Sequence, residues 1–81
     1  MPEPAYTPIA CGAHDRLEAL AVQHALVAVV WHDETGDARH VTARITDVVA
    51  RDGADWVVLS TGETVRADRL VAVDGIPVGP A

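Results

Sequence analysis

Cys11 and His14 are the first two side chains of this chain whose types and spacing could do chemistry. Their C-x-x-H spacing is that of half a zinc site, and three more histidines follow at His24, His32 and His40. A structural zinc site needs four converging ligands, and the sequence holds no second C-x-x-C or H-x-x-x-H pair. Cys11 and His14 could also form a nucleophile and its base, but a small buried cysteine anchoring the N-terminal arm is the simpler interpretation. We therefore predict no metal site and no catalytic nucleophile.

The glycines and the serine indicate neither a cofactor nor an enzyme. Gly36, Gly53 and Gly62 are isolated turn glycines, without the G-x-G-x-x-G or P-loop context that holds phosphate. Ser60 is the only serine, and no G-x-S-x-G elbow surrounds it. We expect a non-enzymatic protein that needs no cofactor.

Carboxylates dominate the remaining polar chemistry. Twelve Asp and Glu stand against six Arg and no Lys, so the formal net charge is −6. Such a charge repels phosphate backbones, which disfavours direct nucleic-acid binding and favours a basic partner. The plainer interpretation of Asp15 and Glu18 is a capping box at the start of a helix, because both residues sit where a box requires them. Asp33, Glu34 and Asp37 are typical of a solvated turn.

The length of 81 residues allows one small domain, spanning residues 1–81. A single cysteine favours a reducing compartment, and the N-terminus lacks the basic and apolar segments of a secretory signal. The longest uncharged run, residues 19–31, is shorter than the roughly 20 apolar residues that cross a bilayer. We expect a soluble, cytoplasmic protein with no membrane contact.

An extended arm and one helix are predicted at the N-terminal end. Residues 1–13 contain three of the five prolines and show no helical period. Apolar residues then recur at helical spacing from Leu17 onwards, which predicts a helix over residues 14–24.

Beyond residue 25 the periodicity changes to two, which is typical of strands. Val27, Val29 and Trp31 fall on one face of the first strand. We predict a domain of the α+β class, mainly β, in which the N-terminal helix precedes a strongly bent, five-stranded antiparallel sheet or small barrel over residues 25–74. The tail, residues 75–81, is expected to fray. The strands centre on residues 26–32, 40–46, 56–60, 63–65 and 70–73.

Several runs of residues resemble one known family, the Rho-binding antiterminators (Rof, also called YaeO). The similarity extends from about Tyr6 to Val73. The runs that carry it are Tyr6-x-Pro8-Ile9-x-Cys11, Asp15-x-Leu17-Glu18, Ala43-x-x-x-Asp47, Gly62-Glu63-Thr64 and Arg66-x-Asp68-Arg69-Leu70.

The resemblance implies a helix on an Sm-like bent barrel, and it implies a function. Members bind the Rho transcription-termination hexamer at its primary RNA-binding surface, block RNA loading and so cause antitermination. An acidic protein can compete for a surface built to hold RNA, because that surface is basic. Family positions that contact Rho match Asp15 and Glu18 at the helix start and Arg51 between the second and third strands. With His14, which replaces an aromatic hydroxyl position, these residues form the predicted Rho-binding site.

Two other functions remain open. An Sm-like module could bind RNA itself, although the net charge and the spread of arginines from Arg16 to Arg69 are unfavourable for RNA. The chain could also be an acidic interaction domain with a partner other than Rho, since Gly12 and Ala13 stand where the family commonly has acids. We expect a monomer, because acidic copies repel one another.

Overall fold

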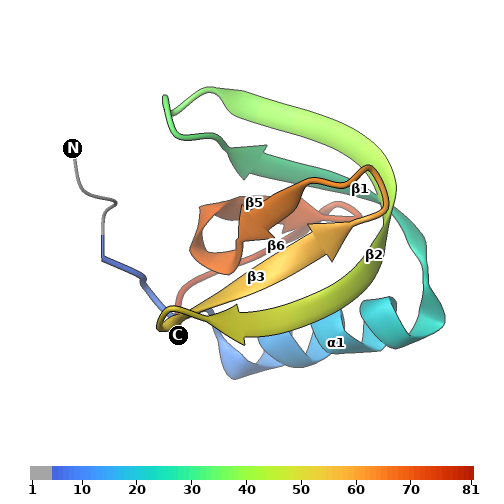
Figure 1. Cartoon of the computed structure of the whole chain (residues 1–81), viewed down its shortest axis with the longest axis horizontal. Helices are drawn as coiled ribbons and strands as arrows, with labels where there is room; N and C mark the ends of the chain where they lie inside the picture. The colour runs from blue at the N-terminus through green and yellow to red at the C-terminus, as the bar shows by residue number, and fades with distance from the viewer. Residues whose placement is uncertain (1–4) are drawn as a thin grey trace.

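The computed structural model describes residues 5–81, and within this range it contains one α-helix, one 3-10 helix and six strands (Figure 1). The predicted α+β, mainly β class is therefore confirmed. No helix in this range has the length and apolarity needed to cross a membrane. The elements are α1 (Cys11–Gln23), β1 (Leu26–His32), β2 (Ala38–Arg51), β3 (Ala54–Leu59), β4 (Thr64–Arg66), η1 (Ala67–Arg69), β5 (Leu70–Val73) and β6 (Ile76–Pro77).

The six strands form one antiparallel sheet in the order β4-β3-β2-β1-β5-β6. The long strand β2 belongs to both halves of the sheet: residues 38–44 pair with β1, and residues 45–51 pair with β3. The register shifts between Ile45 and Asp47, where an irregularity of this kind bends and twists a strand. β2 consequently curves around the molecule, and the sheet is strongly bent (Figure 1).

Two details of the predicted sheet are wrong. The described residues form six strands rather than five, and the sheet is open, with β4 and β6 as its edges. The sixth strand exists because Asp74 and Gly75 both have positive φ values, 55° and 78°. Two such residues make the tight hairpin turn that returns the chain along its own strand, so β6 pairs with β5.

The tail does not fray as predicted. Ile9 and Pro80 form an isolated bridge, and the Ala81 N–H donates to the Pro8 carbonyl at 2.9 Å. The two ends of the described chain are therefore joined by backbone hydrogen bonds. Residues 1–4 of the predicted arm lie outside the described residues.

The helix begins three residues earlier than predicted and ends one residue earlier. Ala10 precedes its first turn without a side-chain cap, so the predicted capping box is wrong and Asp15 lies exposed inside the helix. The Ala10 N–H instead donates to the Gly79 carbonyl at 3.0 Å, which ties the helix start to the tail. His24 ends the helix in the left-handed conformation, with φ 50°.

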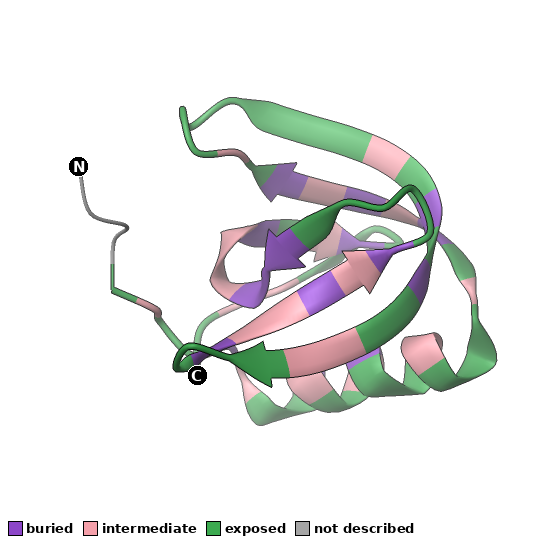
Figure 2. Cartoon of the chain, in the orientation of Figure 1, coloured by how far each residue is buried: buried purple, intermediate pink, exposed green. Residues whose placement is uncertain are grey.

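The core lies between α1 and the inner face of the bent sheet (Figure 2). Val27, Val29 and Trp31 are all buried, so the predicted two-residue alternation in β1 is confirmed. Leu17 is the helix residue inserted most deeply. The largest fully buried side chains are Leu17, Val29, Ile45, Val57, Leu59 and Val73.

Candidate partner-binding surface

The start of α1 meets the hairpin between β2 and β3. His14 on the helix lies 3.6 Å through its Nε2 from the Oδ2 of Asp55 on β3. Its Nδ1 lies 3.9 Å from the Oε1 of Glu18, one turn further along the helix. The imidazole therefore stands between two carboxylates from different elements. When protonated, it forms an ion pair with each of them.

Tyr6 joins the N-terminal arm to the same place. Its hydroxyl donates a hydrogen bond to the Asp55 Oδ2 at 3.3 Å. Burial raises the pKa of the Tyr6 hydroxyl above its usual value, and the negative charge of Asp55 raises it further. Tyr6 is therefore held neutral as the donor to Asp55. The arm and the helix therefore both contact this one carboxylate of the hairpin.

Arg51 occupies the end of β2 beside the turn. Its guanidinium carbon lies 5.2 Å from the centroid of the Trp56 ring, and the Trp56 indole N–H donates to the Arg51 carbonyl at 3.1 Å. A cation over an indole face is attracted to it, so Trp56 holds both the backbone and the side chain of Arg51. A cavity of about 380 Å³ lies beside the turn, and Tyr6, Arg51 and Asp55 are among its lining residues.

We call this the helix–hairpin surface and define it by Tyr6, His14, Glu18, Arg51 and Asp55. Of the four predicted site residues, the structure places His14 and Glu18 in it directly and brings Arg51 to it through the hairpin. Asp15 is exposed on α1 and is not part of the contacts that join helix and hairpin.

Sequence reasoning missed two members of this surface, Tyr6 and Asp55. Tyr6 did carry a signal, since it belongs to the run that resembles the antiterminator family. Asp55 carried none, because its contacts arise only when the hairpin folds against the helix.

The electrostatics of these segments are acidic. Four carboxylates, Asp15 and Glu18 on the helix and Asp52 and Asp55 on the hairpin, stand against two guanidiniums, those of Arg16 and Arg51. The Glu18 side chain is 56% exposed, so its charge faces solvent. A surface of this kind is suited to a basic partner.

Cys11 differs from its prediction. It is exposed at the first position of α1, so the expected role as a buried anchor is wrong. Ala13 and Leu17 bury the helix face instead, because the earlier helix start turns Cys11 towards solvent. Among residues 5–81, no three His, Cys, Asp or Glu side chains are grouped so that they could share a metal ion.

Comparison with known proteins finds no protein-family model and no curated protein that matches this chain. The chain is therefore characterised by its own fold and surface. It is a small, mainly β domain with a helix and an acidic helix–hairpin surface.

Proposed function

We propose that this protein inhibits the transcription termination factor Rho, and that its helix–hairpin surface occupies the primary RNA-binding site of the Rho hexamer. The observation that supports this most directly is the 3.6 Å approach of His14 to Asp55. It joins the helix start and the β2–β3 hairpin, the two segments to which the resemblance assigns Rho contacts. We further propose that the bent sheet with its helix is an open form of the Sm-like fold.

The proposed mechanism is electrostatic competition. A site that holds RNA presents cationic side chains, and the carboxylates of the helix–hairpin surface offer them an alternative set of anions. Occupation of that site by a folded domain excludes RNA, so Rho does not load and termination fails. The protein acts as a monomer, without a cofactor and without a reaction of its own.

Each residue has a role in this proposal. Glu18 in the helix–hairpin surface and Asp15, which lies beside it on α1, contact the cationic surface of Rho, because both residues are exposed. His14 holds Glu18 and the hairpin carboxylate in a fixed relation. Arg51, stacked on Trp56, contacts an acidic or polar group at the edge of the Rho site.

Displacement of RNA from Rho tests the proposal. Fluorescence anisotropy of a labelled pyrimidine-rich RNA on purified Rho is followed while the protein is added. We expect the wild-type protein to release the RNA. The Asp15→Asn, Glu18→Gln double variant should release it only at a roughly tenfold higher concentration, which corresponds to a loss of about 1.4 kcal/mol of binding free energy. Release by the wild type should weaken as salt is raised, because exposed charges are screened.

A matched control carries the same change of charge elsewhere. Glu34 and Asp37 are exposed in the turn between β1 and β2, so the Glu34→Gln, Asp37→Asn variant loses two charges outside the helix–hairpin surface. It should displace RNA as well as the wild type does. Failure of the folded wild-type protein to displace RNA from active Rho would refute the proposal. Equal loss in both double variants would show that net charge, and not this surface, is responsible.

A further inference from the structure

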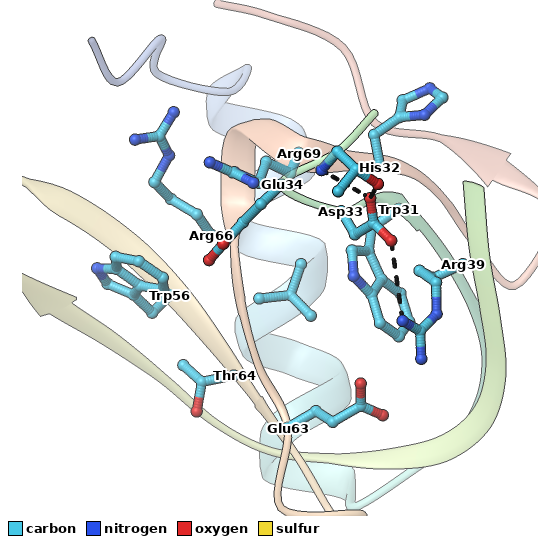
Figure 3. Close-up of a pocket in the computed structure, with 12 residues that line it drawn as sticks. Trp31, His32, Asp33, Glu34, Arg39, Trp56, Glu63, Thr64, Arg66 and Arg69 are labelled. Atoms are coloured by element: carbon cyan, nitrogen blue, oxygen red, sulfur yellow. Dashed lines mark hydrogen bonds and ion pairs between the residues drawn. The ribbon is translucent and has the colours of Figure 1, made fainter. Parts of the chain in front are cut away.

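A second cavity, of about 360 Å³, lies on the concave side of the bent sheet. Its walls come from the β1–β2 turn on one side and from β3, β4 and η1 on the other, elements that the bend of β2 brings to face each other. It shares no lining residue with the cavity beside the β2–β3 turn. The lining residues that carry chemistry include Trp31, Arg39, Trp56, Glu63, Arg66 and Arg69 (Figure 3).

Both tryptophans of the chain line this cavity. Trp31 and Trp56 lie on opposite sides of it (Figure 3). Trp31 is buried and Trp56 is half-buried, with one of its faces covered by Arg51. Indoles at a cavity wall offer flat apolar surfaces, on which planar aromatic rings stack.

Three of the six arginines line the same cavity, although the whole chain carries a net charge of −6. They are Arg39, Arg66 and Arg69, and the lining carboxylates Asp33, Glu34 and Glu63 balance them. Counted over its lining residues alone, the cavity is formally neutral, and Arg66 also pairs with Asp68 outside the lining. Guanidinium groups are the side chains best shaped to hold phosphate or carboxylate oxygens.

The charged groups are distributed unevenly around the cavity. Arg66 and Arg69 lie with Glu34 towards one end, and Glu63 lies at the other end (Figure 3). Arg39 approaches from β2, with its Nη1 3.8 Å from the Asp33 Oδ2 and its side chain 55% exposed. An exposed, singly contacted guanidinium can turn to a ligand at little cost.

From this arrangement we propose that the cavity binds a free mononucleotide. The base packs against the indoles, the phosphate accepts hydrogen bonds from the exposed Arg39 guanidinium, and Glu63 accepts one from an amino group of the base. The volume lies near the lower end of the roughly 300–1,000 Å³ of ligand sites, which suits one nucleotide rather than several. The net charge of −6 opposes a polyanion much more than a single phosphate.

Proton–nitrogen NMR of the two indole N–H groups tests this proposal, because both tryptophans line the cavity. The uniformly labelled protein is titrated with adenosine monophosphate, and in parallel with adenosine and with ribose 5-phosphate, each of which lacks one half of the ligand. We expect saturable shifts of both indole signals with the nucleotide. Each half ligand should bind about tenfold more weakly or worse.

Two variants with the same change of charge locate the phosphate. Arg39→Gln removes an exposed guanidinium from the cavity, whereas Arg44→Gln removes one from the same strand outside it. We expect weaker nucleotide binding, by roughly tenfold, only for Arg39→Gln. Equal weakening in both variants, or no saturable shift with the folded protein, would overturn the proposal.

A further arm separates the free nucleotide from RNA. A hexamer of adenylate is titrated under the same conditions, and we expect it to bind no more tightly than the mononucleotide. Much tighter binding of the hexamer would refute the free-nucleotide assignment and show that the cavity holds one base of a strand. Neither result depends on Rho, so this proposal and the proposed function fail independently.

Discussion

Arg66 and Asp68 form a two-point ion pair that is almost completely buried. The Arg66 Nε lies 2.6 Å from the Asp68 Oδ1, and its Nη2 lies 2.9 Å from the Oδ2. The two side chains are only 8% and 10% exposed. The Asp68 Oδ2 also accepts the Thr7 N–H at 2.9 Å, and the Arg66 guanidinium lies 5.9 Å from the centre of the Tyr6 ring. The pair therefore fixes the arm that carries Tyr6 into the helix–hairpin surface.

Removal of one member of this pair should destabilise the whole domain. Asp68→Ala removes both hydrogen bonds that the carboxylate accepts from the buried Arg66 and leaves the Thr7 N–H without this acceptor, which we expect to cost about 3–5 kcal/mol of unfolding free energy. Urea unfolding followed by tryptophan fluorescence measures it. Glu34→Ala, at an exposed turn, is the control and should change stability by less than about 0.5 kcal/mol. A similar small effect for Asp68→Ala would contradict the argument.

Asp55 should control the ionisation of Tyr6. Burial and the Asp55 charge both raise the Tyr6 pKa, so Asp55→Asn should lower that pKa towards its usual value without restoring it fully. Tyr6 is the only tyrosine, and phenolate absorbance therefore reports on it alone. A raised pKa in the folded state contributes stability below the unfolded pKa, and this is lost as the pH rises through the folded pKa. Glu18→Gln is the matched control and should leave the Tyr6 pKa unchanged.

In the β1–β2 turn, the pKa of Asp33 is shifted in the opposite direction, below its usual value. The Thr35 hydroxyl is the main cause of the lowered Asp33 pKa, and it donates to the Asp33 Oδ1 at 2.6 Å. Thr35→Val should therefore raise the Asp33 pKa, as measured by NMR of the carboxyl carbon. A lowered pKa contributes stability above the unfolded pKa, and this is lost as the pH falls through the folded pKa. Thr42→Val, elsewhere on the surface of the sheet, should have no effect; an unchanged Asp33 pKa in Thr35→Val would exclude the hydroxyl as the cause.

Two glycine substitutions should change stability in opposite directions. Gly53 has φ 77° in the turn of the helix–hairpin surface, so Gly53→Ala should cost roughly 1–2 kcal/mol. Gly12 lies in the first turn of α1 with open space around it, so Gly12→Ala should stabilise by up to about 1 kcal/mol. Thermal unfolding compares both with the wild type. Stabilisation by Gly53→Ala would show that the turn relaxes to another conformation.

The sequence alone determined the features that depend on neighbouring residues. The alternation of Val27, Val29 and Trp31 predicted the buried face of β1, because side chains of a pleated strand alternate between its two faces. The strand predicted around residues 40–46 exists but extends to Arg51, where Asp52 and Gly53 adopt the positive φ values of a tight turn. The excess of carboxylates likewise predicted an acidic surface without any knowledge of the fold.

Only the tertiary structure decided the features that depend on residues far apart in the chain. The helix starts at Cys11 because Ala10 bonds to Gly79, and β6 forms because a second strand is present for it to join. The approach of His14 to Asp55 requires the bend of β2, which brings the hairpin to the helix. A periodic pattern reports which face of an element is buried, whereas the partner of each side chain is set by how the elements pack. For that reason His14, Glu18 and Arg51 could be named in advance, whereas the contacts of Asp55 with His14 and Tyr6 could not.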